Sequence, residues 1–575
     1  MIRFLLALLV AAGFLLSLAA GKAWIAPWSF ASGTPEALVL LELRLPRALL
    51  GLLVGAVLGA AGAVLQGYLR NPLAEPGVLG VSATAALGAV LAIFLGAGGQ
   101  PLAIAATAMA FALGAVALLG LIAGASGLQL ILAGVVLSSL AAALTSLLIS
   151  LAPTPFALGE IVTWLMGALT DRTMADVRLL LGPASVSFVL MALAGRALDA
   201  LALGEAAAAS LGTDLARTRR LVVAGVGLGV GASVAVTGVI SFVGLVVPHL
   251  LRPLVGPEPS RLLFPSALGG AALVLFADSL VRLAPGRGRA EARDRHGARR
   301  RALLPVAPVA QPDRSHITAP LLDAHGLAVR RNGFRLGPVD LALPAGRVCA
   351  ILGPNGAGKS TLLLALAGLL PGSAGDIRLD GQPLARLERR ARARLLAFLP
   401  QVGPVHWNLS ARALVLLGRQ PHRPPFGPPR QEDLAAVEEA LAAVDTLHLA
   451  DRPVDRLSGG ERARVLFARV LAGRPRVILA DEPLQNLDPA HQLQTVRLVR
   501  AAAEGGAAVA AVVHDLPLAR RLADDVLLVK EGRLLASGPA EAVLVPETLA
   551  AGFGVSVSPE LVPVAPAPAE ARPDA

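Results

Sequence analysis

The stretch that decides the fold of the second half of this chain reads Gly353-Pro354-Asn355-Gly356-Ala357-Gly358-Lys359-Ser360-Thr361. It fits the phosphate-binding pattern G-x-x-x-x-G-K-[ST]. Residues 347–352 before it are apolar and predict a buried parallel strand, and residues 362–368 after it predict a helix that ends at a glycine. A bare match could arise by chance, but strand, glycine loop and helix are the context that the motif requires.

These nine residues, from Gly353 to Thr361, are expected to bind the phosphates of a nucleoside triphosphate. Glycines let backbone N–H groups close around phosphate oxygens, and the helix N-terminus adds the positive end of its dipole. We expect Lys359 to reach the β- and γ-phosphates and Ser360 to hold Mg²⁺. The chain has only three lysines, and one of them occupies the position that the motif demands.

Composition separates an apolar first half from a globular second half. The 575 residues are 55% hydrophobic and 16% charged, with a mean hydropathy of +0.66, which is too apolar for a soluble protein of this length. The net charge of +11 suggests nucleic-acid binding, but the arginines flank apolar segments, as the positive-inside rule predicts, and aromatic residues are only 3%. The single cysteine, Cys349, excludes an internal disulfide, and we interpret it as a small core residue.

Nine apolar runs lie within residues 1–283, most of them near the ~20 residues that a membrane-spanning helix needs. They cover about residues 2–20, 48–68, 78–97, 101–123, 128–151, 177–195, 221–240, 242–255 and 262–283, of which 242–255 is short. A cleaved signal peptide is the alternative for the first run, but the runs that follow favour a retained helix. Glycines at spacing four predict close helix–helix packing, at Gly51, Gly55 and Gly59 and at Gly225 and Gly229.

Four motifs of the apolar half resemble the permease subunits of bacterial importers for iron–siderophores, haem and cobalamin. They are Arg44-Leu45-Pro46-Arg47, Asn71-Pro72-Leu73-Ala74-Glu75-Pro76-Gly77-Val78-Leu79-Gly80, Trp164-Leu165-Met166-Gly167 and Phe242-Val243-Gly244-Leu245-Val246-Val247-Pro248-His249. The resemblance covers about residues 1–283. It implies that the basic, helical segment 196–220 lies in the cytoplasm and forms the coupling helices that press on an ATPase.

The same resemblance implies roles for two arginines. Arg44 and Arg47 would lie on the outer face and meet acidic residues of a substrate-binding protein, with plain interfacial anchoring as the alternative. His249 follows a proline near a helix end, and we interpret it as structural rather than as a metal ligand.

The junction between the halves departs from that family, which ends with a tenth spanning helix. Residues 284–318 are instead rich in Arg, Ala and Pro and predict a linker. If the N-terminus lies inside the cell, nine spans would leave the second half outside, where there is no ATP. Our hypothesis is that the last helix was lost or is read out of frame; otherwise one run does not span, or basic residues hold the junction inside. An unbroken frame in the coding DNA, with no apolar helix in either other frame, would contradict the frameshift.

From residue 321 the pattern changes to short strands and helices, an α/β signature. Residues 399–401, 477–483 and 511–515 each end an apolar strand in polar side chains, where an open parallel sheet binds ligands. Taken alone, the neighbouring carboxylates Asp481 and Glu482 could be an ordinary loop pair, but the ordered motifs around them argue against it.

We expect Asp481 to help hold Mg²⁺ and Glu482 to act as general base toward the attacking water. His514 would stabilise that geometry, and Gln401 would sense both the metal and the water. The predicted catalytic residues are therefore Glu482, His514 and Gln401, and the predicted metal ligands are Ser360, Asp481 and Gln401.

Leu457-Ser458-Gly459-Gly460-Glu461 resembles the signature of ABC transporter ATPases, over about residues 321–555. Residues 418–422 resemble the branch that serves iron–siderophore and related uptake. The resemblance implies ATP as the nucleotide and contact of Ser458, Gly459 and Gly460 with the γ-phosphate bound to a second copy. The family stacks adenine on an aromatic residue, and the corresponding position here is Arg331, so that either Phe334 or the arginine could stack.

The sequence thus predicts a multi-domain chain: an all-α polytopic membrane permease (1–283), a linker (284–318), an α/β P-loop ABC ATPase (319–555) and a disordered tail (556–575). The predicted function is ATP-driven import of an iron chelate across the bacterial cytoplasmic membrane, with Mg²⁺ and with the ATPase facing the cytoplasm. Expected partners are a second copy, a periplasmic or lipoprotein substrate-binding protein and lipid, but no nucleic acid. An exporter, an ATPase serving another permease and a non-transporting remnant are the alternatives.

Overall fold

The structure, a computed structural model, divides the chain into two units. Unit 1 comprises Met1–Ala202 and Asp214–Arg300, and unit 2 comprises Leu203–Thr213 and Arg301–Ala575. The described residues are 2–21, 24–28, 34–122, 127–283, 320–331, 333–370, 372–401, 405–424, 427–485, 487–554, 556–557 and 563–564. The predicted linker, residues 284–318, therefore lies outside the described residues.

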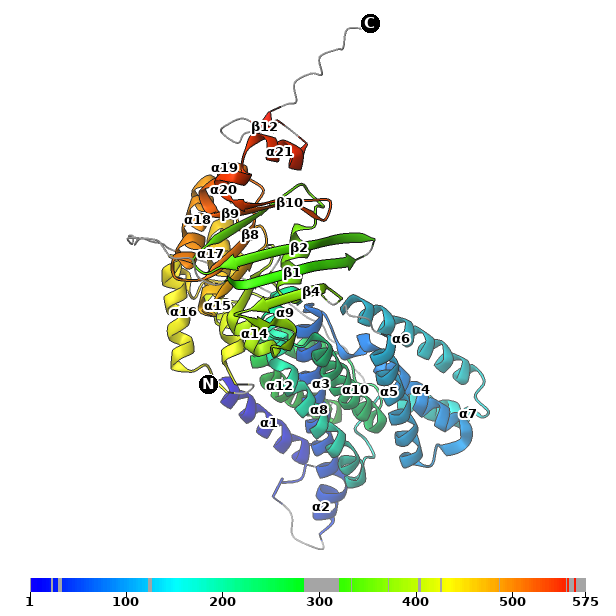
Figure 1. Cartoon of the computed structure of the whole chain (residues 1–575). Coiled ribbons are helices and arrows are strands. Elements are labelled where there is room, and N and C mark those ends of the chain that lie inside the picture. Colours follow the sequence, from blue (N-terminus) through cyan, green and yellow to red (C-terminus); the bar gives the residue numbers. More distant parts are fainter. Residues whose placement is uncertain are drawn as a thin grey trace. The chain divides into compact units, whose positions relative to one another are not determined.

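Unit 1 is all-helical, as predicted (Figure 1). Its elements are α1 (Ile2–Ala19), α2 (Pro35–Leu38), η1 (Val39–Arg44), α3 (Leu45–Leu69), η2 (Pro76–Leu79), α4 (Val81–Ala92), η3 (Ile93–Ala97), α5 (Pro101–Ile122), α6 (Gly127–Ser150), α7 (Pro155–Leu165), α8 (Met174–Leu201), α10 (Leu215–Thr237), α11 (Val243–Val255) and α12 (Pro259–Leu283). Seven helices of the described residues are long and apolar enough to cross a membrane.

Two of the nine predicted runs fall short of that length. The run at 78–97 forms a helix over Val81–Ala97, and the run at 242–255 forms α11, which is short as expected. The sequence reading missed α7, an 11-residue helix that begins where Thr154 accepts a hydrogen bond from the N–H of Ala157. Its brevity hides it from a search for runs of spanning length.

The predicted small-residue packing is confirmed. A Cβ added at Gly55 would overlap the carbonyl oxygen of Gly270, and one added at Gly59 would overlap that of Ser266. The backbones of α3 and α12 therefore touch, which only glycine permits. Gly229 also lies at a close contact, but with side chains: a Cβ there would overlap the hydroxyl of Ser187 in α8.

A proline removes one backbone hydrogen bond from α11, and a side chain of α3 replaces the missing donor. Pro248 has no N–H, so it leaves the carbonyl of Gly244 without its helical donor. The buried amide of Gln66 donates to Gly244 O and to Leu245 O, both at 3.3 Å. Gln66 also accepts a hydrogen bond of 2.7 Å from Arg252, and this ties α3 to α11.

Unit 2 has the predicted α/β core. A six-stranded sheet runs in the order β10-β9-β3-β8-β7-β6, with β10 antiparallel and the other pairs parallel. A four-stranded antiparallel sheet runs in the order β2-β1-β4-β5. The strands are β1 (Pro320–Arg331), β2 (Phe334–Pro344), β3 (Val348–Leu352), β4 (Ala374–Leu379), β5 (Gln382–Pro383), β6 (Leu396–Leu399), β7 (Val477–Ala480), β8 (Ala508–Val512), β9 (Asp525–Lys530) and β10 (Arg533–Pro539).

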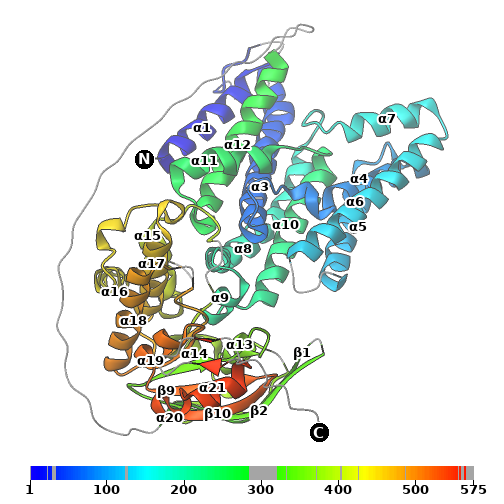
Figure 2. The same ribbon diagram turned by 90° about the horizontal axis from the view of Figure 1, so that it is seen from above.

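Helices lie beside these sheets (Figure 2). They are α13 (Lys359–Leu366), α14 (Arg389–Leu395), α15 (Ala411–Leu416), α16 (Gln431–Ala443), α17 (Gly459–Ala472), α18 (Pro489–Glu504), α19 (Leu516–Leu522), α20 (Ala540–Val543) and α21 (Pro546–Phe553). The predicted disordered tail contains a short antiparallel pair, β11 (Ser556–Val557) and β12 (Pro563–Val564), so that part of the prediction is corrected.

The segment 196–220, predicted to be helical, is divided among three helices. Residues up to Leu201 belong to α8 and residues from Leu215 to α10, which leaves α9 (Glu205–Ser210) as a six-residue helix between them. Leu203–Thr213 groups with unit 2, although its two neighbours in the chain belong to unit 1. Gly212 lies against the backbone of Arg389 and against Ala393 in α14.

Candidate functional site

The phosphate loop begins where the buried strand β3 ends. All five residues of β3 are buried, and Gly353 follows with a φ of 147°. A Cβ at Gly353 would overlap the carbonyl oxygen of Val529, so the turn needs glycine. Gly358, with a φ of 101°, precedes α13 and points the first N–H groups of that helix toward the loop.

Lys359 lies inside this loop. Its Nζ donates to the carbonyls of Gly353 at 2.8 Å and Pro354 at 2.9 Å, and the residue is 6% exposed. Burial lowers the pKa of the Lys359 ammonium, while the neighbouring Glu482 and Asp481 act in the opposite direction. A cation held among loop carbonyls is positioned to bind phosphate oxygens.

Ser360 and Asp481 meet beside the loop, although they are distant in sequence. The hydroxyl of Ser360 donates to Oδ1 of Asp481 at 3.1 Å. Burial raises the pKa of Asp481, against the lowering effect of that hydrogen bond. A hydroxyl and a partly desolvated carboxylate side by side fit Mg²⁺, which binds oxygen ligands and keeps several waters.

Glu482 lies at the centre of a second polar group. Its Oε1 is 2.6 Å from Nε2 of His514, and its Oε2 accepts a hydrogen bond of 2.8 Å from Nε2 of Gln401. Glu482 has a φ of 52°, a left-handed conformation that costs about 1–3 kcal/mol in a residue other than glycine. The three predicted catalytic side chains are thus brought together, each from the end of a different strand of the parallel sheet.

Gln401 does not share the contacts of the other two predicted metal ligands. Its amide nitrogen also donates to Oε1 of Gln485 at 2.7 Å, which leaves its own Oε1 as the only atom that could bind a cation. The sequence reading missed Gln485. The signal for it was its place directly after Pro483 and Leu484, in the loop that the Asp481–Glu482 strand enters.

Two cavities adjoin these groups. One of about 350 Å³ is lined by the phosphate loop, Glu482 and Phe334. The other, of about 550 Å³, is lined by Gln401, Glu482, His514 and residues that the sequence reading did not single out, among them Gln492 and Asp515. Asn355 and Glu482 line both cavities, so the space beside the phosphate loop adjoins the space around Glu482.

Phe334, one of the two candidates for stacking on adenine, lies beside the phosphate loop. It lines the phosphate-loop cavity, and its ring lies so close to Gly358 that a Cβ there would come within 2.8 Å of the ring. Arg331 ends β1, and its side chain lies outside the described residues. Phe334 is thus placed where its ring could contact a base, and stacking by either residue stays a prediction.

The signature motif caps α17. Ser458 Oγ accepts a hydrogen bond from the N–H of Glu461, and the Glu461 carboxylate accepts one from the N–H of Ser458 at 2.8 Å. Neither cavity is lined by Ser458, Gly459 or Gly460 among the described residues. These three predicted nucleotide-binding residues are thus not brought to the phosphate loop of their own chain.

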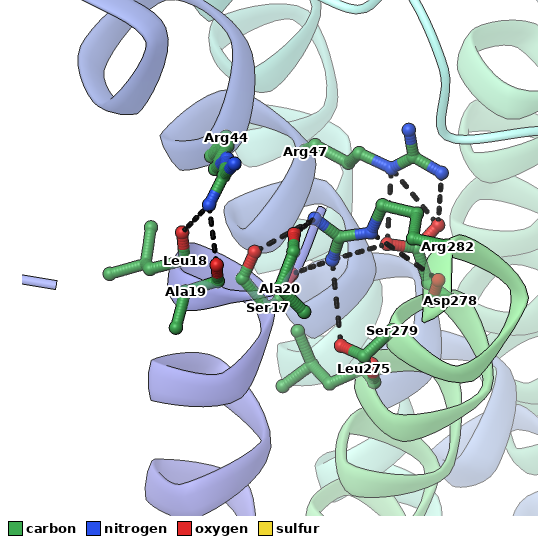
Figure 3. A network of polar contacts seen from close by, with 10 residues as sticks. All are labelled: Ser17, Leu18, Ala19, Ala20, Arg44, Arg47, Leu275, Asp278, Ser279 and Arg282. Atoms are coloured by element: carbon green, nitrogen blue, oxygen red, sulfur yellow. Dashed lines mark hydrogen bonds and ion pairs between the residues drawn. The ribbon is translucent and has the colours of Figure 1, made fainter. Parts of the chain in front are cut away.

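Unit 1 carries a second cluster of charged side chains, the arginine cluster, made of Arg44, Arg47, Arg282 and Asp278. Figure 3 shows Arg44 and Arg282 pointing at the end of α1. Arg44 donates to the carbonyls of Leu18 at 2.8 Å and Ala19 at 2.6 Å. Arg282 donates to the carbonyls of Ser17 and Ala20, both at 2.9 Å.

The carboxylate of Asp278 holds the other side of the arginine cluster. It is 2.6 Å from Arg47 and 2.9 Å from Arg282 (Figure 3). Arg44 is 8% exposed, which favours anchoring over docking for that residue. The side chain of Arg47 is 17% exposed, so its outer edge stays accessible. His249 is exposed, and no group of three metal-binding side chains occurs in the described parts of the chain.

Comparisons with known proteins match both halves. Residues 8–289 match the FecCD transport family, and residues 336–485 match the ABC transporter family. The hemin import ATP-binding protein HmuV of Pseudomonas entomophila is 46% identical over 243 residues, 41% of this chain and 94% of that protein. The cobalamin import ATP-binding protein BtuD of Halobacterium salinarum is 41% identical over 239 residues, 41% of this chain and 60% of that protein.

Among solved structures, a metal-chelate type ABC transporter in an inward-facing conformation is 36% identical, with a TM-score of 0.46, and covers 49% of this chain and 90% of that one.

The second half of the chain is a P-loop ATPase of the cassette type. Its phosphate loop, its polar strand ends and its signature motif define this class. The chain belongs to the ABC transporter family and joins a FecCD permease domain to an ATP-hydrolysing cassette in one polypeptide. With seven apolar helices in its described part, it is a multi-pass inner-membrane protein.

Proposed function

We propose that this chain imports a metal chelate of the siderophore, haem or cobalamin type, driven by ATP hydrolysis on the cytoplasmic side. One observation carries the proposal: a FecCD domain over residues 8–289 is joined to a cassette 46% identical to a hemin import ATP-binding protein. The cassette relatives include a cobalamin import ATP-binding protein, so the chelate is defined only as a class.

The nucleotide site is completed by a second copy of the chain. The phosphate loop and Phe334 bind ATP from one side, and Ser458, Gly459 and Gly460 of the second copy approach the γ-phosphate. Two features support this: the signature residues do not line their own chain's cavities within the described residues, and they form the N-terminus of α17, where N–H groups bind anions.

Hydrolysis then uses the group around Glu482. Mg²⁺, held by Ser360 and Asp481, would neutralise charge on the β- and γ-phosphates. The Glu482 carboxylate takes a proton from the attacking water, and His514, 2.6 Å away, holds that carboxylate in place. Gln401 donates a hydrogen bond to the other carboxylate oxygen of Glu482. Because Gln401 follows β6, a shift at the end of that strand would move this hydrogen bond.

The segment Leu203–Thr213 couples the permease to this chemistry. It is covalently part of the helical half, yet it groups with the cassette, and Ala206 packs on the hydrophobic core of unit 2. Closure of two cassettes around ATP would therefore displace the ends of α8 and α10. A separate substrate-binding protein delivers the chelate, and the exposed edge of Arg47 is the remaining docking candidate.

The test is transport by the purified full chain in proteoliposomes. ATPase turnover and uptake are measured with haemin, cyanocobalamin and ferrichrome, each with and without candidate binding proteins, and with Glu482→Gln as the control. Stimulation of both by one chelate and its binding protein supports import. ATPase activity that no chelate or binding protein changes contradicts it and favours an exporter, a cassette for another permease or a remnant.

A further inference from the structure

Helix α17 connects the signature motif to a buried cation at its other end. Ser458 caps the N-terminus, and Arg469, which is 3% exposed, lies in the last turn. The helix has 14 residues and is therefore about 21 Å long. A rigid helix of this length carries a displacement at one end to the other.

The guanidinium of Arg469 reaches the strand that leads to Gln401. Its Nη2 donates to the carbonyl oxygen of Phe398 at 3.2 Å, and Phe398 lies in β6, three residues before Gln401. The backbone of Arg469 is closely packed, because a Cβ added at Gly418 would overlap the carbonyl oxygen of Arg469. Any shift of this end of α17 is therefore passed to β6.

The same guanidinium lies at the contact with the permease segment. A small cavity of about 20 Å³ is lined by Arg469 and Phe398 from the cassette and by Ser210 and Leu211 from Leu203–Thr213. All of these residues belong to unit 2. A cavity of this size holds about one water molecule, so the segment is closely seated on Arg469.

Arg469 remains charged in this place. Burial lowers its pKa to about 10, which still leaves it protonated at neutral pH. The C-terminal end of α17 stabilises a cation through its dipole. Its Nε has no hydrogen-bond partner among the described residues, so the position of the guanidinium depends on few contacts and on the seating of its neighbours.

We propose that Arg469 is a positioning residue that links the seat of Leu203–Thr213 to the signature motif and to Gln401. It touches neither nucleotide nor metal and acts through α17 and β6. The inference rests on the proposed role of Leu203–Thr213 as the coupling segment, but it does not depend on which substrate is carried.

The test is a double-mutant cycle on ATPase turnover by the full chain in lipid nanodiscs. Arg469→Lys keeps the charge but loses the planar fork, and we expect kcat to fall about tenfold with KM for Mg–ATP within twofold. Leu211→Ala, in the segment Leu203–Thr213, should lower kcat in the native chain but not further in the Arg469→Lys background. Arg474→Lys, an exposed arginine next to α17, is the matched control and should stay within twofold of the native chain.

Additive effects of Arg469→Lys and Leu211→Ala, or equal changes in kcat and KM, would overturn the inference. If Arg469→Lys does not fold, the Leu211→Ala variant alone tests the inference, because it leaves Arg469 in place.

Amide hydrogen exchange in the Leu211→Ala variant should then be faster at residues 398–401 and at residues 458–462 together. Faster exchange confined to 203–213 would overturn the link. Chelate uptake is not a readout in either experiment, so failure of the proposed substrate class is distinguished from failure of this inference.

Discussion

The nucleotide site and the arginine cluster both gather charged side chains, but they differ in what surrounds the charges. Glu482, Gln401 and Lys359 border cavities of about 350 and 550 Å³. Arg44 and Arg282 instead point at the end of α1, where they satisfy backbone carbonyls. A charged cluster that borders open space is suited to binding, and one that is closed on helix ends is suited to holding a structure together.

The two regions attract charges of opposite sign because they present opposite ends of helices. The phosphate loop presents the N-terminus of α13, which attracts anions, and α1 presents its C-terminus, which attracts cations. The first end is left for a ligand and the second is filled by the protein itself. Four predictions test this contrast, beginning with the largest expected effect.

Glu482→Gln should lower kcat for ATP by about 10²–10⁴-fold, because it removes the proposed general base. ATP binding should change little, since the amide keeps the shape of the side chain. Steady-state ATPase rates and binding of a fluorescent ATP analogue measure the two effects. His514→Ala is the companion variant and should lose less activity, because Gln401 still holds Glu482. Equal turnover in native chain and Glu482→Gln would mean that this open cluster is not catalytic.

Asp278→Asn should destabilise the permease by about 3–5 kcal/mol, because two largely buried arginines lose their common carboxylate. Unfolding of the full chain in nanodiscs measures this change. Glu439→Gln removes the partner of the exposed Arg474 and should cost about 0–1 kcal/mol. ATPase activity is expected to persist in both variants. An Asp278→Asn permease as stable as the native one would contradict the structural role of the cluster.

Phe334→Ala should weaken ATP binding by about 1–3 kcal/mol if the ring stacks on adenine. Inorganic tripolyphosphate, which has no base, should bind equally to variant and native chain. The pair of affinities, measured by calorimetry, separates base recognition from phosphate recognition. An equal loss for both ligands would indicate that the ring supports the loop at Gly358 and does not bind the base.

Asp481 should give the smallest effect, and it depends on pH. Burial raises the pKa of Asp481 above the ordinary 3.8, so the folded chain binds that proton more tightly than the unfolded chain. Its contribution to stability is therefore present at low pH and is lost as pH rises from 3.8 to the raised pKa. At neutral pH without Mg²⁺, Asp481→Asn should raise the Tm by about 2–4 °C or less. With Mg²⁺ the order should reverse, because the ion binds the ionised native side chain.

How much the sequence predicted differs between the two regions for a physical reason. In the cassette, each short motif requires its own backbone conformation, so the phosphate loop and the polar strand ends followed from local sequence. The role of the signature motif came from its resemblance to a known family. Gln485 was missed because its role is a contact with Gln401, 84 residues away. The arginine cluster joins residues up to 265 positions apart, and no local pattern specifies that pairing.

The capping of α1 by arginines also has a consequence for the order of synthesis. The first helix leaves the ribosome long before Arg282, which lies 265 residues after Ser17. At about 5–20 residues per second, the wait is roughly 10–50 s. During that time the carbonyls at the end of α1 have no guanidinium from α12, although Arg44 arrives early. While the rest of the permease is made, only Arg44 can bind the carbonyls at the end of α1. The remaining contacts form when Arg282, near the end of α12, has been synthesised.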